Sequence, residues 1–400
     1  MKFLNNIDLK NKKILFRADL NVPVLNGKVS DYSRIKSIVP SINQLLKNNN
    51  KVFILAHFGR PKGKINKKYS LRFLCNELAA ILNKEKIHFI EAFKDTVIKK
   101  KIDKMHKGEI CLFENIRFNP EEETNDLNFS KNLSLHFDYF INDAFSASHR
   151  NHSSIVGLPK YLPAAAGISF MNEIKNLDNF LNNAKKPNIA IIGGSKISTK
   201  IKVIYNLIDL FDTVIIGGAM ANTFLLTSNI KIGKSLVEKD YIDIAKDILE
   251  KAKLSNCEII LPKDVVCSPD IKNTENIRIC NIDDVFDDHM ILDVGEKTTK
   301  LISEKILKSR SVLWNGPLGA FEYKPFDKSS IDVANIIYQY SKDLQIDTMA
   351  GGGDTIAAIN LTSAQNGFDY LSNAGGAFLE WLEGNKSPGA IALEKNKLLN

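Results

Sequence analysis

The feature of this chain that most constrains its fold is the alternation of short β-branched runs with longer amphipathic stretches. The amphipathic stretches Ser33–Lys47 and Ser70–Leu82 are predicted to be helices. The short runs are predicted to be strands: Lys13–Leu20, Val52–Ala56, Ile110–Phe113, Tyr139–Asn142, Ile189–Ile192, Val214–Ile216, Glu258–Leu261, Val312–Trp314 and Asp347–Met349. Short apolar strands separated by helices are typical of parallel sheets with helices on both faces.

The length of 400 residues is too great for one ordinary core and favours two domains. Residues 171–186 are predicted to form a helix that links them, although one more sheet-covering helix is the ordinary alternative. The fold class we expect is α/β, with two doubly wound parallel-sheet domains facing each other across a hinged cleft. The expected parts are an N-terminal domain (1–170), the helix (171–186), a C-terminal domain (187–378), and a segment (379–400) that packs back on the N-terminal domain.

The net charge of +8 raises the question of nucleic-acid binding, but the lysines are spread along the whole chain, which indicates compositional bias. No apolar run reaches the roughly 18 residues of a membrane span, and the N-terminal residues lack the apolar core of a signal peptide. Five scattered cysteines without a CxxC pair fit a reducing compartment and give no zinc site. We therefore expect a cytoplasmic protein without a nucleic-acid or membrane partner.

The arginines are more informative than the net charge. The chain has only eight among its 54 basic residues, and six lie in the first 150 positions: Arg17, Arg34, Arg60, Arg72, Arg117 and Arg150. The planar guanidinium group binds phosphate or carboxylate through two parallel hydrogen bonds, which lysine cannot imitate. The first half is therefore predicted to hold an anion site.

Polar motifs follow the predicted strands of the first half, where open α/β sheets gather their ligands. Asp19 and Asn21 have the same side-chain parity and would face one site if the first strand stays extended. Asp31 or Ser33 could cap the next helix and place Arg34 near its N-terminus, where anions are favoured. A turn signal and a solvated surface arginine are the ordinary alternatives.

Three further motifs add basic groups after strands. His57 and Arg60 bracket a glycine, and the segments after the later strands supply Arg117, Arg150 and His149. A lone histidine at such a position is more often structural, but its pairing with arginine favours a binding role. Together these side chains carry enough positive charge for a small ligand with a phosphate and a carboxylate.

Glycines follow the strands of the second half, where backbone N–H groups can approach a phosphate. Lys196 and Lys200 are spaced to share one face of a helix, after the Gly193-Gly194 pair. Asp354, in Gly351-Gly352-Gly353-Asp354-Thr355, could hold Mg²⁺, or could simply cap a helix. Neither a complete Walker loop nor a GxGxxG fingerprint occurs, which argues against the common nucleotide motifs and a dinucleotide dehydrogenase.

The chain resembles the phosphoglycerate kinase family from Arg17 to the segment Ser387-Pro388-Gly389. The strings RADLNVP, HFGRP, ENIRF, GGSK, NGPLGAFE and GGGDT occur in the family's order, and their joint occurrence is highly specific. The resemblance implies a monomeric glycolytic enzyme that transfers a phosphoryl group from 1,3-bisphosphoglycerate to ADP with Mg²⁺, giving 3-phosphoglycerate and ATP.

The resemblance also implies a role for individual residues. The 3-phosphoglycerate would be held by Asp19, Asn21, Arg34, His57, Arg60, Arg117 and Arg150. The nucleotide would be held by Gly194, Lys196, Lys200, Gly217, Asn315, Pro317, Glu322, Gly352, Gly353, Asp354 and Thr355. Glu322 would contact the ribose and Asp354 the metal. The groups expected at the moving phosphoryl group are Arg34, Lys196, Gly375 and Gly376.

Some positions depart from the family's usual pattern. Asn373 and Ala374 stand where a threonine and a glycine are usual, Ser146 replaces a glycine, and Thr199 precedes Lys200 where an aspartate is common. None of these changes removes a group with an expected chemical role. A catalytically weak pseudoenzyme or an anion-binding protein of the same fold is the alternative.

Overall fold

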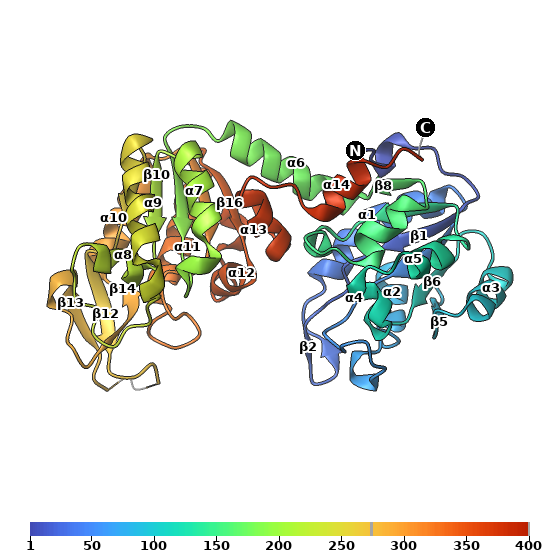
Figure 1. The fold of residues 1–400 in the computed structure, drawn as a ribbon, viewed down its shortest axis with the longest axis horizontal. Helices are drawn as coiled ribbons and strands as arrows, with labels where there is room; N and C mark the ends of the chain where they lie inside the picture. The colour runs from blue at the N-terminus through green and yellow to red at the C-terminus, as the bar shows by residue number, and fades with distance from the viewer. Residues whose placement is uncertain (273–274, 399–400) are drawn as a thin grey trace. The chain divides into compact units, whose positions relative to one another are not determined.

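The computed structural model describes residues 1–272 and 275–398, and the chain divides into two compact units (Figure 1). The N-terminal unit contains Met1–Lys175 together with the residues from Lys386 onward, and the C-terminal unit contains Asn176–Asn385. The division falls inside α6 (Ile168–Asn183). Among the described residues, no helix is long and apolar enough to cross a membrane.

The N-terminal unit is built on a six-stranded sheet in the order β5-β6-β4-β1-β7-β8, in which every neighbouring pair is parallel. Its strands are β1 (Lys13–Arg17), β4 (Lys51–Leu55), β5 (His88–Ile90), β6 (Ile110–Phe113), β7 (Tyr139–Asn142) and β8 (Ala164–Ala166), and a hairpin adds β2 (Val24–Leu25) and β3 (Lys28–Val29). Its other helices are α1 (Ser33–Lys47), α2 (Leu74–Ile81), α3 (Asp95–Lys104), α4 (Pro120–Thr124), α5 (Leu127–Ser134) and α14 (Pro388–Glu394).

The central strand β1 marks the point where the chain reverses direction across this sheet. After β1 the chain builds β4, β5 and β6 on one side, and it then returns to build β7 and β8 on the other. In open α/β sheets such a switch point leaves a crevice at the carboxyl ends of the strands. The segments that follow β1, β4, β6 and β7 therefore lie at one edge.

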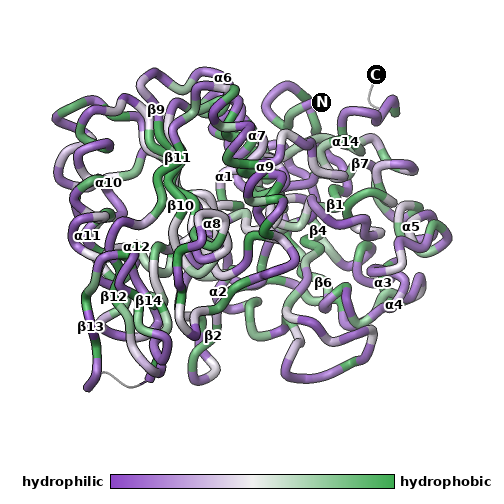
Figure 2. The backbone as a smooth tube through the Cα atoms, turned by 60° about the vertical axis from the view of Figure 1, so that its left-hand side comes forward, coloured by the Kyte–Doolittle hydropathy of each residue, from purple (hydrophilic) through white to green (hydrophobic). Residues whose placement is uncertain are grey.

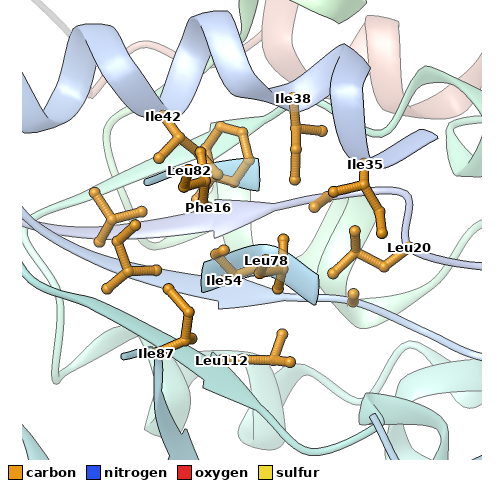
Figure 3. Close-up of a cluster of buried hydrophobic side chains, with 14 of the residues drawn as sticks. Phe16, Leu20, Ile35, Ile38, Ile42, Ile54, Leu78, Leu82, Ile87 and Leu112 are labelled. Carbon is orange, nitrogen blue, oxygen red and sulfur yellow. The ribbon is translucent and has the colours of Figure 1, made fainter. Parts of the chain in front are cut away.

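The core on one face of this sheet explains why α1 forms where it does. Ile35, Ile38 and Ile42 recur at helical spacing and point from α1 toward Phe16 and Ile54 on the strands (Figure 3). All five are at most 1% exposed. Burial of the strands on both faces also accounts for their continuous apolar sequences.

The C-terminal part of the chain rejoins the N-terminal unit through specific contacts. The Asn396 side chain donates to the carbonyl oxygens of Pro159 and Leu162, at 2.6 and 2.9 Å, and accepts from the Ala164 backbone N–H at 3.2 Å. These bonds pair buried polar groups around β8 and hold the segment after α14 in place.

The C-terminal unit repeats the plan with a parallel sheet in the order β11-β10-β9-β15-β16-β17 and adds a three-stranded antiparallel sheet, β13-β12-β14. Its strands are β9 (Asn188–Ile192), β10 (Thr213–Ile216), β11 (Glu258–Ile260), β12 (Asp264–Ser268), β13 (Arg278–Asn281), β14 (Met290–Val294), β15 (Ser311–Asn315), β16 (Asp347–Gly351) and β17 (Tyr370–Ser372). Its helices are α7 (Ile201–Leu210), α8 (Ala221–Thr227), α9 (Ile242–Leu254), α10 (Glu296–Lys308), α11 (Lys328–Tyr340), α12 (Gly353–Asn360) and α13 (Gly376–Leu382).

The chain reverses at β9, as it does at β1 in the other unit. Strands β10 and β11 lie on one side of β9, and β15, β16 and β17 lie on the other. The tube in Figure 2 shows β9, β10 and β11 as strongly hydrophobic, in contrast to the mixed colouring of the helices. Trp314 is the largest fully buried side chain in the core of this unit.

The structure confirms the predicted parallel α/β architecture and corrects some details. β1 ends at Arg17 instead of Leu20, so Asp19 and Asn21 do not share a face of an extended strand. Helix α2 begins at Leu74, because residues 70–73 form turns in which Glu114 accepts from Ser70 and Leu71. The antiparallel sheet was not predicted, since its exposed strand β13 lacks a continuous apolar run.

Candidate active site

Asp19 lies at the centre of the polar cluster in the N-terminal unit. Its Oδ2 accepts hydrogen bonds from Arg34 Nη1 and Ser146 Oγ, and its Oδ1 accepts from the Asn21 backbone N–H at 3.1 Å. Burial opposes ionisation, but the positive charge of Arg34 and the hydrogen bonds from Ser146 and Arg34 hold the pKa of Asp19 at about 2. The carboxylate therefore fixes Arg34, in the first turn of α1, at the carboxyl end of β1.

Gly59, in the motif HFGRP, forms hydrogen bonds with residues of two other motifs, RADLNVP and ENIRF. Its backbone N–H donates to Asn21 Oδ1 at 2.9 Å, and its carbonyl oxygen accepts from Arg117 Nη1 at 2.8 Å. Arg117 is 3% exposed and also forms an ion pair with Glu123, with 3.3 Å between Nε and Oε1. A φ of +59° at this position favours glycine.

His57 is buried directly after β4. Its Nδ1 lies 3.1 Å from Arg17 Nη2. Burial, followed by the positive charges of Arg17 and Arg117, lowers the pKa of His57 well below its ordinary value. The imidazole is therefore neutral at physiological pH.

The structure separates the six early arginines into different environments. Arg34, Arg117 and Arg150 belong to the cluster, since Arg150 is half-buried and its charge lowers the pKa of His57 and of Arg117. Arg60 is exposed next to Gly59. Arg72 instead lies over the Phe89 ring, 4.3 Å from its centroid. Arg17 is a buried member of the cluster that sequence reasoning left without a role.

His149 lies on the loop after β7, two residues beyond Ala147. It is half-buried, and burial followed by the charge of Arg150 lowers its pKa. It lies next to Arg150, and its buried Nδ1 has no hydrogen-bond partner among the described residues. A binding role for this ring stays a prediction.

A second cluster forms in the C-terminal unit around Asn315, at the end of β15. Asn315 Oδ1 accepts from Lys200 Nζ, and its Nδ2 donates to the Gly351 carbonyl oxygen at 2.6 Å. Thr355 Oγ1 donates to the same carbonyl at 2.9 Å and accepts from the Gly316 backbone N–H at 2.7 Å. Burial lowers the pKa of Lys200 to about 8, while the nearby charge of Asp354 opposes that shift.

Glycines allow the backbone segments of this cluster to touch. A Cβ on Gly193 would lie 2.0 Å from the Pro317 carbonyl oxygen, and a Cβ on Gly218 would lie 2.5 Å from that of Gly194. Gly217 donates from its backbone N–H to the Ile192 carbonyl at 2.9 Å. Gly352 has a φ of +99°, which favours glycine before α12.

A cavity of about 340 Å³ opens beside these segments within the C-terminal unit. Five of its lining residues are informative: Gly194, Pro317, Glu322, Asp354 and Asp293. Glu322, Gly353 and Asp354 are exposed. The volume falls in the range of small-ligand pockets.

Lys196 and Lys200 do not share a helical face, which corrects the expectation from their spacing. They flank a 3₁₀ turn, η7 (Ile197–Thr199), and Lys196 is exposed whereas Lys200 is 9% exposed. Glu238 holds this turn, because it accepts from Ser198 N at 2.9 Å and from Ser198 Oγ at 2.7 Å. Sequence reasoning missed Glu238.

Gly375 and Gly376 stand at the beginning of α13, with a φ of +55° at Gly375. Strand β17 pairs with β16 in parallel, with Ser372 opposite Gly351. Because the carboxyl ends of both strands meet at one edge, this turn lies on the same side of the sheet as Gly352–Thr355. A role for the two glycines stays a prediction. Asp354 is not the N-cap of α12, since Gly352 occupies that position.

Two buried carboxylates near these clusters also escaped the sequence analysis. Glu122 is 0% exposed and contacts Ser154 in the N-terminal unit. Asp293 accepts from Ser329 N and Ser329 Oγ next to the cavity, and burial raises its pKa to about 7. An acidic residue within an apolar strand could have marked Asp293, whereas Glu122 stands in a run of three glutamates without a distinguishing signal.

Comparisons with known proteins agree on one family. The family model described as phosphoglycerate kinase matches residues 4–385. A phosphoglycerate kinase from Chelativorans sp. (strain BNC1) is 44% identical over 388 residues, covering 97% of each chain. One from Brucella abortus is 42% identical over 392 residues, covering 98% of this chain and 99% of the relative.

Solved structures give the same result for the fold. The structure of phosphoglycerate kinase from Coxiella burnetii matches with a TM-score of 0.88 at 35% identity and covers 99% of each chain. The one from Pyrococcus horikoshii OT3 matches with a TM-score of 0.85 at 27% identity and covers both chains fully. The resemblance inferred from the motifs is thereby confirmed. This chain belongs to the phosphoglycerate kinase family, whose enzymes are phosphotransferases with a carboxyl group as acceptor.

Proposed function

We propose that the chain transfers a phosphoryl group reversibly from 1,3-bisphosphoglycerate to ADP, giving 3-phosphoglycerate and ATP in glycolysis. The N-terminal cluster binds the phosphoglycerate through Asp19, Asn21, Arg34, His57, Arg60, Arg117 and Arg150. The C-terminal cluster binds the nucleotide through Gly194, Lys196, Lys200, Gly217, Asn315, Pro317, Glu322, Gly352, Gly353, Asp354 and Thr355.

The observation that carries this assignment is the different chemistry of the two clusters. Arg34 and Arg117 are held in place by Asp19 and Gly59, so their remaining donors are oriented before an anion arrives. The C-terminal cluster instead offers glycine-rich backbone and the cavity beside Asp354. Charged side chains suit a small phosphorylated acid, and exposed backbone N–H groups suit a chain of phosphates.

Phosphoryl transfer requires mainly in-line positioning and neutralisation of the equatorial oxygens. In this proposal the carboxylate of 3-phosphoglycerate is the nucleophile, so no side chain has to form a covalent bond. It is ionised at neutral pH, so no strong general base is required. Arg34 and Lys196 stabilise the charge on the moving phosphoryl group, and the backbone N–H groups at Gly375 and Gly376 add donors. The contribution of each charged group is about 3–4 kcal/mol.

Mg²⁺ is the metal expected with the nucleotide. Among the described residues there is no cluster of three or more His, Cys, Asp or Glu side chains suited to a metal. That fits a Mg²⁺ ion bound by one carboxylate and the phosphates of its nucleotide, and Asp354 is an exposed carboxylate at the cavity. Bound there, Mg²⁺ would neutralise phosphate charge, while Lys196 and Lys200 orient the phosphates.

Because each substrate binds to its own unit, transfer requires a hinge closure that brings them together and excludes water. Small-angle scattering with both substrates and with each alone tests this step. The expected result is a smaller radius of gyration only with both. An unchanged radius in the complete ternary complex would overturn the closure proposal. Sedimentation in the same samples tests the expected monomer.

A coupled assay tests the reaction itself. Purified protein is mixed with 3-phosphoglycerate, MgATP, NADH and glyceraldehyde-3-phosphate dehydrogenase, and the loss of NADH is followed. We expect rapid loss that requires 3-phosphoglycerate and Mg²⁺ and collapses in Arg34→Ala and Lys196→Ala. No loss above background from folded protein would contradict the proposed reaction. Cell fractionation would test the proposed cytoplasmic location.

A further inference from the structure

A chain of four buried polar side chains lies behind the phosphoglycerate cluster. Glu122 and Ser154 are 0% exposed, Arg17 is 1% exposed and His57 is 7% exposed. They come from four separate segments: α4, the π-helical turn η5 (Ser153–Gly157), the end of β1 and the loop after β4. The proposed reaction uses only His57, so the other three need an explanation.

The hydrogen bonds from Glu122 to Arg17 have only one possible direction. Glu122 Oε2 accepts from Ser154 N at 2.8 Å, and Oε1 accepts from Ser154 Oγ at 2.6 Å. The second bond uses the only hydroxyl proton of Ser154. Its Oγ must then accept from Arg17 Nε, which lies 2.9 Å away.

The same logic extends to the imidazole. Arg17 has donors and no acceptor, so its Nη2 donates across the 3.1 Å to His57 Nδ1. A nitrogen that accepts a hydrogen bond carries no proton. The proton of a neutral His57 therefore resides on Nε2.

We propose that Glu122, acting through Ser154 and Arg17, fixes His57 as the neutral tautomer with its proton on Nε2. His57 then serves the anion as an uncharged hydrogen-bond donor, and Glu122 is a positioning residue. The identity of that anion as the phosphoglycerate rests on the proposed function, whereas the tautomer does not.

The charges that face His57 support this assignment. The positive charges near the ring are those of Arg17, Arg117 and Arg150, and the negative charge is that of Asp19. Burial, together with the arginines, lowers the pKa of His57. Desolvation lowers the pKa of Arg17, and the negative charges of Glu122 and Asp19 oppose that shift. A proton on Nδ1 would point at the Arg17 guanidinium, so the arrangement excludes it.

Long-range ¹H–¹⁵N NMR of the histidine rings tests the proposal in the full-length, ligand-free protein. His57→Gln assigns the signal among the seven histidines. We expect the wild-type ring to stay in the single Nε2-protonated form through the range in which an ordinary histidine titrates, around pH 6.5. A proton on Nδ1, or an ordinary titration, would overturn the proposal without any change at Glu122 or Ser154.

Glu122→Gln tests the link to the carboxylate. Glutamine has one acceptor oxygen for two Ser154 donors, so the direction of the bonds is lost and Arg17 is released. We expect a mixture of His57 tautomers, a higher pKa at His57, and a KM for 3-phosphoglycerate raised about tenfold with a smaller change in kcat. Glu121→Gln, the exposed neighbour on α4, is the matched control and should leave all three unchanged.

Ser154→Ala removes the hydroxyl link without changing charge and serves if Glu122→Gln fails to fold. Wild-type tautomer signals in both folded variants would refute the role of Glu122 and Ser154. A fixed tautomer in a protein without kinase activity would refute the proposed function and leave this inference standing. An active enzyme without the fixed tautomer would support the proposed function and refute this inference.

Discussion

The two units share one sheet plan but build their clusters from different chemistry. In each, the chain reverses at a central strand, β1 or β9, and the polar motifs follow the carboxyl ends of the strands beside it. The N-terminal cluster uses arginines paired with acceptors, as in Arg34 with Asp19. The C-terminal cluster uses glycines that bring backbones into contact, as at Gly193 and Pro317.

This difference shows how each kind of site is kept in shape. A charged side chain can point in many directions, so it needs partners, and Asp19 and Gly59 provide them for Arg34 and Arg117. A glycine backbone needs room instead, and any added atom displaces its neighbours. The N-terminal cluster should therefore be sensitive to lost charges and hydrogen bonds, and the C-terminal cluster to added volume.

The largest expected effect is the loss of one charge from either unit. Arg34→Ala and Lys196→Ala should each lower kcat by about 10²–10³-fold, because each removes a group that stabilises the developing charge. The coupled assay measures both. Arg34→Lys should recover little, since the planar fork is lost.

Arg72→Ala is the matched control for these charge removals, because its guanidinium lies over Phe89 and outside the cluster. Its kcat should equal that of the wild type. A comparable loss in Arg72→Ala would mean that the total positive charge matters and the positions of the arginines do not.

The second largest effect is expected from one methyl group in the C-terminal unit. Gly193→Ala places a Cβ 2.0 Å from a backbone carbonyl oxygen that cannot move cheaply. We expect a local destabilisation of about 1–3 kcal/mol, measured as faster amide hydrogen exchange in β9 and β15. Gly353→Ala, where a Cβ would meet nothing within 4 Å, should change the exchange little. Equal exchange in both variants would contradict the proposed packing constraint.

The sequence predicted most of the architecture for a physical reason. A parallel sheet brings the carboxyl ends of its strands to one edge, so motifs far apart in sequence must meet. That geometry brought Asp19, His57 and Arg117 into one cluster without any knowledge of side-chain contacts. Their hydrogen-bond partners could not be predicted from the sequence. Strand β1 ends before Asp19, so Asp19 lies in a loop, where its Oδ1 accepts from the Asn21 backbone N–H.

The residues that hold the clusters were not predictable from local pattern. Glu121, Glu122 and Glu123 are adjacent acids, and Glu122 is distinguished by distant partners, Ser154 and His152. Glu238 is likewise set apart by its contact with Ser198, 40 residues away. Burial of a charge depends on such distant partners, which helical or strand periodicity does not encode.

A third prediction concerns pH, where carboxylates of the two units should differ. Burial raises the pKa of Asp293 to about 7, so the folded state binds a proton that the unfolded state releases above 3.8. The contribution of Asp293 to the free energy of unfolding is therefore fully present below pH 3.8. It is lost as the pH rises through about 7, at up to about 1.4 kcal/mol per pH unit. The protection of amides at the start of α11, taken relative to their intrinsic exchange rate at each pH, should therefore fall from pH 4 to about 7, and Asp293→Asn should remove this fall.

Asp19 provides the contrast for this measurement. Its pKa is lowered to about 2, so its contribution is complete above 3.8 and is lost only as the pH falls through about 2. Exchange of the Asn21 and Gly59 amides should show no step from Asp19 over the range that changes α11. A parallel step at those amides would mean that Asp19 is not held ionised by Arg34.

The smallest effect is expected at Ser146, whose hydroxyl donates to Asp19 Oδ2. Ser146→Gly removes a donor to Asp19 Oδ2 and should weaken the cluster by about 1 kcal/mol, or roughly fivefold in the KM for 3-phosphoglycerate. Carboxyl NMR should show a higher pKa at Asp19, since that hydrogen bond lowers it. Ser146→Ala removes the same hydroxyl without freeing the backbone, so matching results in both variants assign the effect to the hydrogen bond. If only Ser146→Gly changes the KM, the effect comes from the freed backbone. The N-terminal cluster would then depend on its backbone conformation as well as on its hydrogen bonds, and the two units would differ less than proposed.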